Sequence, residues 1–292
     1  MKANSGARSF HFISYTLLTV ISLLCIIPFW LIAVGSMTKE EDILVNGFRF
    51  WPKHFSSAAY DAIWKYGSSI LNAYEVTILI TVIGTSLGLF LTAMGAYVLS
   101  RRDYAFRNGL SFFVYFTTLF SGGLIPWYIM IVKNLHLKDT VMALILIGLV
   151  NAWNVLLMRN FMNSIPVEVT ESAKIDGAGD FTIFMRLILP LSTPALATIG
   201  LFIALNYWND WFAPNLFITT DSKVPLQYFL YRILSKAEIL SHGSIPTNGA
   251  EVPPSETLKM AVAVVATGPM VFLFPLLQRY FVKGLTIGAV KG

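Results

Sequence analysis

Six long apolar stretches alternate with shorter segments that carry charge, glycine or proline along this 292-residue chain. Each stretch reaches the roughly 20 residues that a helix needs to cross the hydrocarbon core of a bilayer. Composition agrees, because 55% of the residues are hydrophobic, only 13% are charged and the mean hydropathy is +0.65. The pattern therefore predicts an all-α integral membrane protein, a single multi-pass domain over residues 1–292 with six transmembrane helices. The predicted spans cover residues 12–35, 72–100, 110–132, 141–161, 191–212 and 258–282.

Basic residues predict how these spans are oriented. An even number of spans places both termini on one side, and the short connections after spans two and four, like both tails, carry arginine and lysine. Short basic segments of this kind are typically cytoplasmic, whereas charge in long loops has little influence on topology. The basic residues concerned are Lys2, Arg8, Arg101, Arg102, Arg107, Arg159, Lys174, Arg186, Arg279, Lys283 and Lys291. Residues 163–190 and the tail 283–292 are thus predicted to be cytoplasmic, and the loops 36–70 and 214–257 external.

Interruptions of the apolar pattern predict local structure. Gly122-Gly123 and Pro126 should break the third helix, at a point where protein or water satisfies the freed backbone groups. Residues 56–64 have the sequence of a short capped helix. Apolar residues recur at helical spacing over 226–240, which predicts an amphipathic helix on the outer surface. Its apolar face could receive an external partner or rest on the bilayer or the bundle.

Polar and aromatic residues inside the fourth and fifth spans are candidates for a substrate path. Amides offer hydrogen-bond donors and acceptors to sugar hydroxyls, and aromatic rings stack on sugar C–H faces. Hydrogen bonding between helices explains the asparagines equally well, and an interfacial aromatic belt explains the tryptophans without a ligand. The candidates are Asn151, Asn154, Asn206, Tyr207, Trp208 and Asn209.

Several kinds of chemistry are missing from the sequence. There is no phosphate-binding loop for ATP, no nucleophile elbow, and no local metal-ligand motif around the four isolated histidines. Cys25 is the only cysteine, so an intrachain disulfide is excluded. The net charge of +5 is scattered, which argues against a nucleic-acid interface. The chain is therefore predicted to be non-catalytic, and any chemical energy must come from another subunit.

The polar segment 163–190 lies between two apolar spans and combines two short helices with a tight turn. Pro166 and the acidic residues after it favour a helix start. Asp176-Gly177-Ala178-Gly179-Asp180 is small enough for a sharp break and for the close approach of another backbone. The second helix is predicted to place four apolar side chains on one face. These are Phe181, Phe184, Leu187 and Ile188.

The residues of this segment resemble a known loop. Glu171-Ser172-Ala173, Asp176-Gly177-Ala178 and Leu189-Pro190 are similar to the EAA loop of bacterial ABC-importer permeases. Along nearly its whole length the chain resembles the carbohydrate class related to the maltose permease MalG, and particularly its LplC-like branch. Ser172 and Leu187 replace a usual alanine and a common isoleucine, both conservatively. Further matches are Ser121–Pro126, Trp208-Asn209-Asp210, Pro225-Leu226-Gln227, Gln278–Gly284 and Gly288–Gly292.

The resemblance implies the type I ABC importer permease fold and a heteromeric importer in the bacterial cytoplasmic (inner) membrane. This subunit would form a heterodimer with a second homologous permease. Two copies of a cytoplasmic ATPase would bind ATP and magnesium, and an external or periplasmic solute-binding protein would deliver an oligosaccharide. Closure of the ATPases would switch the spans between inward-open and outward-open states.

The resemblance also implies residue roles in the EAA loop. Glu171 would contact the ATPase through its carboxylate, and Asp176 would act as a local hydrogen-bonding cap. Ala173, Gly177 and Ala178 would form a closely packed surface. The C-terminal tail would reach the ATPases as well, through Lys283, Gly284 and Lys291.

The cargo stays open at this point. The LplC-like branch is associated with oligosaccharides, some of them acidic and uronate-containing, and the sequence does not choose among them. A secondary transporter driven by an ion gradient is the main alternative, although it would need an ionisable residue at mid-membrane. Glu75, Arg159 and Asp210 lie only near span ends. A non-transporting membrane scaffold subunit is a further alternative.

Overall fold

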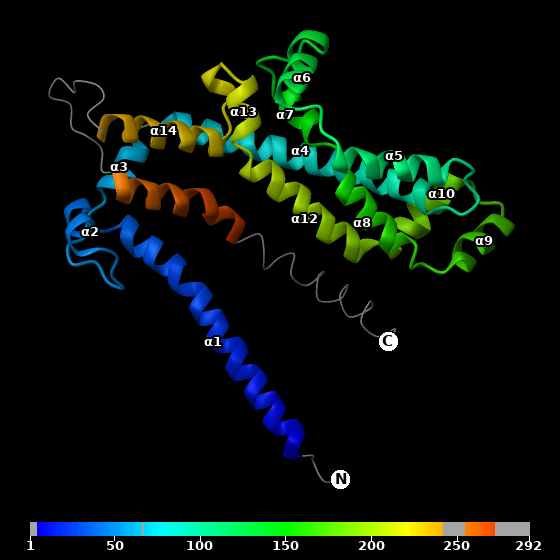
Figure 1. The fold of residues 1–292 in the computed structure, drawn as a ribbon, viewed down its shortest axis with the longest axis horizontal. Coiled ribbons are helices and arrows are strands. Elements are labelled where there is room, and N and C mark those ends of the chain that lie inside the picture. The colour runs from blue at the N-terminus through cyan, green and yellow to red at the C-terminus, as the bar shows by residue number, and fades with distance from the viewer. Residues whose placement is uncertain (1–4, 66, 242–254, 272–292) are drawn as a thin grey trace. The chain divides into compact units, whose positions relative to one another are not determined.

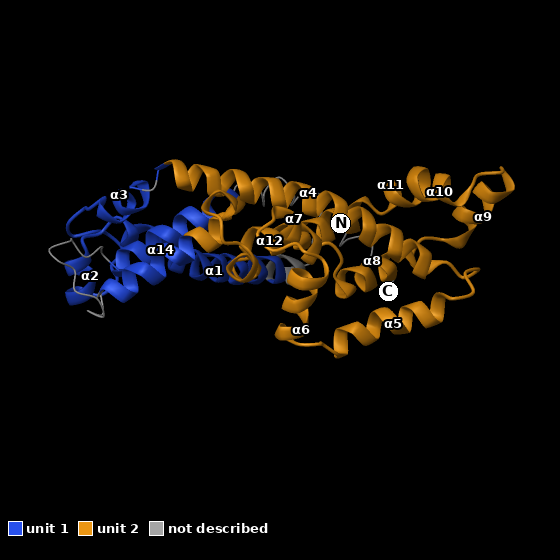
Figure 2. Ribbon diagram, turned by 90° about the horizontal axis from the view of Figure 1, so that it is seen from above, with its two compact units in different colours: residues 1–67, 230–269 blue, residues 68–229, 270–292 orange. Residues whose placement is uncertain are grey.

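The computed structural model describes residues 5–65, 67–241 and 255–271, and Figure 1 follows its helices in chain order. Regular structure in these ranges is helical, apart from an isolated β-bridge between Thr38 and Phe55. The chain forms two compact units (Figure 2). Unit 1 comprises residues 1–67 and 230–269, and unit 2 comprises residues 68–229 and 270–292.

Unit 1 contains the first helix and the short helices after it. The elements are α1 (Ser5–Ser36), α2 (Glu40–Asn46), α3 (Ala58–Trp64) and a helix that begins at residue 255. The Glu40 carboxylate accepts hydrogen bonds from the backbone N–H groups of Glu256 and Thr257, both at 2.8 Å. Because the first N–H groups of a helix have no intrahelical acceptor, this contact caps the helix that begins at residue 255. The predicted short helix at 56–64 is confirmed as α3.

The first helix is long and apolar on every side. Its stretch Phe10–Ser36 has a hydropathy of 2.7, and none of its most apolar window is buried within the chain. Cys25 is exposed on this helix. A helix that is apolar on all sides needs lipid or another protein around it, because water does not solvate its side chains favourably.

Unit 2 is built around α4 (Gly67–Ser100), a helix of 34 residues. Shorter helices and helical turns follow it in a nearly continuous series. They are α5 (Arg107–Leu119), α6 (Leu124–Ile129), η1 (Met130–Asn134), α7 (Val141–Ile147), α8 (Ala152–Met162), α9 (Val167–Ile175), α10 (Asp180–Ile183), η2 (Phe184–Ile188), α11 (Leu189–Leu191), α12 (Thr193–Asn209), α13 (Phe212–Phe217), η3 (Asp221–Lys223) and α14 (Leu226–Ser241). The last of these continues past the division at residue 230.

The helix α14 has the predicted amphipathic pattern. Leu226, Leu230, Ile233 and Ala237 are buried along one side, at the three- and four-residue spacing of a helical face. Tyr231 and Ile239 are among its exposed residues. The amphipathic helix predicted over 226–240 is therefore confirmed.

Two helices in the described part are long and apolar enough to cross a membrane, and up to five spans result if each bent helix pair is counted as one. The long helices are α1, from Phe10 to Ser36, and α4. The helix that begins at residue 255 is described only as far as 271, so the end of the predicted span 258–282 lies outside the described residues. The six-span pattern stays a prediction.

The bends in the other predicted spans have local causes. The chain turns by 112° between α5 and α6, where Gly123 has a φ of 86° and Pro126 follows in the first turn of α6. This is the break that the Gly-Gly and proline pattern predicts. A second bend of 48° separates α7 from α8, and a third of 84° lies at Ser192 between Pro190 and Pro194. The bend between α7 and α8 is not foreseen by the continuous apolar run over 141–161.

The centre of unit 2 is packed around Tyr207 of α12. Its ring lies so close to Gly84 and Gly148 that a Cβ atom there would stand 2.4 Å and 2.6 Å from ring carbons. Its hydroxyl donates a hydrogen bond of 2.6 Å to the backbone carbonyl of Ile145. The glycines of α4 and of the α7–α8 bend thus admit an aromatic ring where a larger residue would collide. Helices in membranes commonly approach each other through small residues in this way.

Candidate functional site

The polar segment 163–190 folds into α9 and α10, joined by a turn at Gly177. The N–H of Ala178 donates to the carbonyl of Ala173 at 2.9 Å, and the N–H of Gly177 donates to that of Lys174 at 3.0 Å. These two bonds form a Schellman motif, which ends a helix through one residue in the left-handed backbone region. Gly177 supplies that residue, with a φ of 79°. The glycine is required for its backbone, since a Cβ atom there would meet nothing within 4 Å.

Side chains around this turn divide into a buried side and an exposed side. Ala173 is 8% exposed and Ala178 packs partly against the core. Glu171 and Asp176 are exposed. Asp176 caps α9 through its backbone N–H, which donates to the Ser172 carbonyl at 3.1 Å. Among described residues its carboxylate accepts no hydrogen bond, so the backbone of Asp176 rather than its side chain forms this cap.

Two large apolar side chains are exposed beside the turn. Ile175 is 87% exposed and Phe181 is 62% exposed. Phe184 and Ile188 are buried, as predicted for the apolar face of the second helix. The ring of Phe181 lies beside that of Phe184, with centroids 6.4 Å apart, but most of its surface stays exposed. Ile175 was not identified from the sequence, although an isoleucine at the end of a polar helix is a usable signal.

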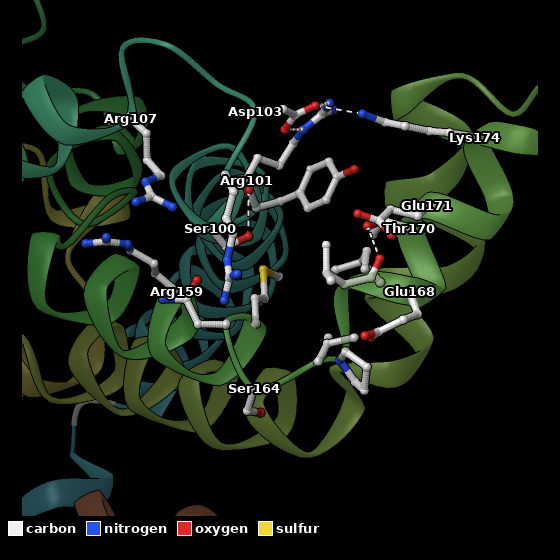
Figure 3. A pocket seen from close by; sticks show the side chains of 18 residues that line it. Ser100, Arg101, Asp103, Arg107, Arg159, Ser164, Glu168, Thr170, Glu171 and Lys174 are labelled. Carbon is white, nitrogen blue, oxygen red and sulfur yellow. Dashed lines mark hydrogen bonds and ion pairs between the residues drawn. The ribbon is translucent and has the colours of Figure 1, made fainter.

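A broad cavity of about 1070 Å³ lies between α9 and the ends of α4 and α8. Figure 3 shows Arg107 and Arg159 on one wall, with Glu168 and Glu171 of α9 on the facing wall. The Nε of Arg159 donates to the carbonyl of Leu99 at 3.1 Å, which joins the end of α8 to the last turn of α4. A cation beside these last carbonyls also interacts favourably with the helix dipole.

Arg101, Asp103 and Lys174 line one edge of this cavity and, together with Asp180, form a group of four charged residues, here called the charge cluster. Arg101 contacts both carboxylate oxygens of Asp103, with Nε at 2.9 Å, and also pairs with Asp180. Lys174 Nζ lies 2.6 Å from Asp103. The hydrogen bonds from Arg101 and then Lys174 hold the pKa of the Asp103 carboxyl below its ordinary value. The contact with Asp103 in turn raises the pKa of Arg101.

Sequence reasoning used Arg101 and Lys174 only as markers of membrane orientation. Asp103 had no predicted role, and Asp180 was named only as the last residue of the predicted break. The mixed signs in Arg101-Arg102-Asp103 were a weak signal, because a purely topological segment needs no acid. Asp103 pairs with Lys174, which is 71 positions away, and no local sequence pattern predicts that contact.

A second polar cluster, here called the loop cluster, consists of Asp139, Thr219, Thr220 and Lys223. Asp139 Oδ1 accepts the backbone N–H groups of Thr219 and Thr220, both at 2.9 Å, and Oδ2 accepts the Thr220 hydroxyl at 2.6 Å. These hydrogen bonds, with that of Lys223 a weaker contribution, hold the pKa of the Asp139 carboxyl below its ordinary value. Asp139 itself has a φ of 57°.

The loop cluster lies beside the start of α4. The side-chain amide of Asn72 donates to the carbonyl of Ser222 at 2.9 Å, and the N–H of Leu226 donates to the Thr77 hydroxyl at 2.7 Å. The stretch of α4 from Asn72 to Ser100 is about 42 Å long, at 1.5 Å per residue. The loop cluster and the charge cluster therefore lie toward opposite ends of one long helix.

The predicted path residues of the fourth span have different surroundings. Asn151 is exposed, and its side-chain oxygen accepts the N–H groups of Trp153 at 2.9 Å and Asn154 at 3.3 Å. It therefore caps the start of α8. Asn154 is buried, with 8% exposure. The two amides share no exposed helical face, and a substrate contact by either stays a prediction.

The fifth span alternates between exposed and buried residues. Asn206 and Asn209 are exposed, whereas Tyr207 and Trp208 are buried. The Asn209 side-chain oxygen accepts from Gln227 at 3.4 Å. Directly after it, the Asp210 carboxylate accepts the N–H groups of two residues in the first turn of α13, which fixes the corner between α12 and α13.

The predicted tail contacts and the metal ligands remain to be considered. The tail residues Lys283, Gly284 and Lys291 lie outside the described residues. In the described ranges, no three His, Cys, Asp or Glu side chains are grouped so that they could hold a metal ion.

A family model, related sequences and a solved structure all indicate the same protein family. Residues 84–287 match the family described as binding-protein-dependent transport system inner membrane component. The chain is 40% identical to the polygalacturonan/rhamnogalacturonan transport system permease protein YtcP of Bacillus subtilis, over 98% of this chain and 99% of that one. It is 39% identical to protein LplC of Bacillus subtilis, over 100% of this chain and 98% of that one.

A solved structure agrees in fold and length. The crystal structure of a bacterial ABC transporter involved in the import of the acidic polysaccharide alginate contains a chain that matches with a TM-score of 0.75 and 29% identity. The match covers 96% of this chain and 99% of that chain. The resemblance to the LplC-like branch and the type I importer permease fold are confirmed, which disfavours the ion-coupled transporter and the scaffold. The chain belongs to the family of inner membrane components of binding-protein-dependent transport systems.

Proposed function

We propose that this chain is the permease subunit of an ATP-driven importer that moves an acidic, uronate-containing oligosaccharide across the cytoplasmic membrane by alternating access. The proposed cargo class rests on one observation, namely that two proteins similar to this chain are both named for the transport of acidic polysaccharides. YtcP is named for polygalacturonan and rhamnogalacturonan transport, and the matching structure belongs to an alginate importer. Both are similar to this chain over nearly its full length.

The complex proposed for it is heteromeric. A second homologous permease would complete a heterodimer around the substrate path, and an external solute-binding protein would deliver the cargo. Two copies of a cytoplasmic ATPase would bind ATP and magnesium. This chain supplies no grouped metal ligands in its described ranges, and it contains no phosphate-binding loop.

Six spans with cytoplasmic termini are part of the proposal. The length of α4 fits one of these spans, because about 42 Å between Asn72 and Ser100 exceeds the roughly 30 Å of the hydrocarbon core. The loop cluster would then lie on the external side and the charge cluster on the cytoplasmic side. Arginine-rich residues 101–107 fit the cytoplasmic assignment.

The turn between α9 and α10 is proposed as the contact with the ATPase. Its exposed side combines the Glu171 carboxylate with the apolar side chains of Ile175 and Phe181. Exposed apolar residues beside a charge are typical of an interface that another protein covers. Ala173 and Ala178 on the buried side hold the turn against the core. The tail contacts at Lys283, Gly284 and Lys291 would add to this interface.

The substrate path is proposed to run along the exposed amides of Asn151, Asn206 and Asn209. Tyr207 and Trp208 would position these amides through packing, and Asn154 would contribute from a buried position.

Tyr207 gives the sharpest test of the distinction between amides that contact the substrate and rings that only pack. Replacing Tyr207 by Phe removes a buried hydrogen bond, which should lower the free energy of unfolding by about 1 kcal/mol. Uptake per assembled complex should stay unchanged.

The coupling contact is tested with Gly177→Val in the reconstituted complex. Valine is strongly disfavoured at a φ of 79°, so the Schellman turn should be lost and the ATPase should dissociate. Gly179→Val is the matched control, because Gly179 has a φ of −69° and open space around its Cβ position. Normal ATPase association and ATP-driven uptake in Gly177→Val would contradict the assignment.

The cargo class is tested by competition. Proteoliposomes that contain the complex and its binding protein should take up labelled oligogalacturonate, and unlabelled uronate oligomers should compete. Neutral oligosaccharides of equal length serve as the control. Equal competition by the neutral compounds would show that the importer does not select acidic cargo.

A further inference from the structure

The end of α4 carries a tightly held guanidinium group. Arg101 follows the last residue of the helix, Ser100, and its N–H donates to the carbonyl of Val98. Its guanidinium carbon lies 5.8 Å from the centre of the Tyr97 ring, and its side chain is only 18% exposed. This arginine therefore behaves as a rigid extension of the helix rather than as a solvated surface charge.

The guanidinium of Arg101 uses all three of its nitrogens. Two of them contact the two carboxylate oxygens of Asp103, and the third pairs with Asp180. A planar guanidinium can hold both oxygens of one carboxylate and still reach a second carboxylate, whereas a lysine ammonium has its three donors on a single nitrogen. Arg101 thus links its own loop to the first residue of α10.

The charge cluster contacts both sides of the Gly177 turn. Lys174 lies on α9 before the turn and pairs with Asp103 at 2.6 Å, whereas Asp180 begins α10 after the turn and pairs with Arg101. Figure 3 shows Lys174 directed from α9 toward Asp103. The two arms of the turn are therefore fastened separately to the end of α4.

Single exposed ion pairs contribute little to stability, but this cluster is a network. Asp103 accepts from two cations, and Arg101 serves two carboxylates. Loss of Asp103 would release Lys174 completely and leave Arg101 with one partner. The contacts therefore fix a geometry, namely the position of the turn relative to α4, more than they stabilise the fold.

We propose that Arg101 and Asp103 are positioning residues that transmit movement of the α9–α10 turn to α4. The inference rests on the proposed function, since it takes this turn as the ATPase contact. When the ATPases displace the turn, the two fastened arms carry the end of α4 with them. The long helix then moves with the turn as one body, and the motion reaches the loop cluster at its other end.

The test uses the whole reconstituted complex and measures substrate taken up per ATP hydrolysed. Asp103→Asn and Lys174→Gln should each lower this ratio, by about 3- to 10-fold for Asp103→Asn and less for Lys174→Gln. The double variant should fall no further than Asp103→Asn alone, because Lys174 acts through Asp103. ATPase association and the amount of assembled complex should remain at the wild-type level.

Arg102→Gln is the matched control, since it removes a positive charge from the next residue, which is exposed and forms no ion pair with any described residue. It should leave the ratio unchanged. A wild-type ratio in Asp103→Asn, or additive losses in the double variant, would overturn the proposal. Loss of ATPase association in Asp103→Asn would also overturn it, in favour of a docking role.

The same experiments separate this inference from the proposed function. If Gly177→Val abolishes ATPase association while Asp103→Asn keeps a normal ratio, the turn is the ATPase contact and only the transmission through the charge cluster is wrong. If Gly177→Val associates and transports normally, the proposed contact itself fails.

Discussion

Asp103 and Asp139 are two carboxylates that join distant segments of unit 2 by different means. Asp103 is contacted by cations, Arg101 and Lys174, through long side chains. Asp139 is contacted mainly by neutral donors, two backbone N–H groups and a hydroxyl. Both carboxyl groups have a lowered pKa, but charged partners dominate in the first case and neutral hydrogen bonds in the second. Asp103 therefore joins its segments mainly through ion pairs, and Asp139 joins its segments mainly through neutral hydrogen bonds.

The two kinds of contact differ in how strictly they depend on direction. Backbone N–H groups hold the Asp139 carboxylate, and the φ of 57° places this residue in the left-handed region, which aspartate tolerates better than most other residues. The partners of Asp103 are the charged side chains of Arg101 and Lys174, which are 18% and 43% exposed. Charge attraction falls off gradually with distance, whereas a hydrogen bond is lost when its geometry changes. The loop cluster therefore depends on the geometry of its hydrogen bonds, whereas the charge attraction in the charge cluster persists while the turn and the end of α4 move together.

The largest expected effect tests the loop cluster. Asp139→Ala removes the acceptor of the Thr219 and Thr220 N–H groups and places alanine in the left-handed region, so the thermal unfolding midpoint of the solubilised complex should fall clearly. Asp139→Asn should change it little, since an amide oxygen still accepts both N–H groups and asparagine tolerates this backbone. Equal destabilisation by both variants would show that charge also dominates at Asp139, and the contrast with Asp103 would disappear.

A smaller effect is expected when the shape of the cation is changed but its charge is kept. Arg101→Lys should lower uptake per ATP several-fold, because a single ammonium nitrogen cannot reproduce the two-point contact with Asp103 together with the pair to Asp180. The unfolding midpoint should move only slightly. Arg102→Lys provides the comparison at an exposed neighbour and should have no effect. Full uptake in Arg101→Lys would mean that net charge alone is sufficient.

A change in ionic strength should have a still smaller effect, and it should weaken the charge cluster more than the loop cluster. Between about 0.1 M and about 1 M salt the screening length falls from about 10 Å to about 3 Å, which weakens exposed charge pairs more than backbone hydrogen bonds. Uptake per ATP should therefore decline modestly in the wild type. Asp103→Asn should have lost most of this salt dependence. An equal decline in that variant would assign the effect to another part of the complex.

The smallest expected effect concerns pH. A carboxyl group whose pKa is lowered on folding stabilises the protein above its ordinary pKa of about 3.9, and this contribution is lost as the pH falls through the lower folded value. Asp103 and Asp139 are therefore both fully ionised between about pH 6 and about pH 8. The difference in uptake per ATP between wild type and Asp103→Asn should be constant over that range. A difference that changes there would indicate another titrating group in the network.

The predicted local structure was correct where its cause lies in neighbouring residues. Gly177 was identified as a tight break, and the structure gives it the positive φ that explains a glycine. The break at Gly123 and the amphipathic helix α14 were also readable from neighbouring residues. In each case the residues that cause the feature lie within a few positions of it, so the sequence contains the whole cause.

The prediction failed or stayed incomplete where burial decides. The periodicity of the second helix places Phe181 beside Phe184, as the structure does, but it does not indicate that Phe184 is buried while Phe181 stays exposed. Tyr207 could be read as a sugar-stacking ring, and in the structure its ring fills the space above Gly84 and Gly148. Periodicity gives the face of a helix on which a residue lies, but only packing determines what covers that face.

The sequence by itself determined that this is a helical membrane protein with a polar segment between two apolar spans, because hydropathy and turn propensity are sums over adjacent residues. Only the tertiary structure decided that Arg101, Asp103, Lys174 and Asp180 form one cluster. Lys174 and Asp103 are 71 positions apart, and their contact depends on the lengths and bends of every helix between them. Charge complementarity over such a separation is one of many pairings that the sequence allows, and folding selects the pairing that the protein uses.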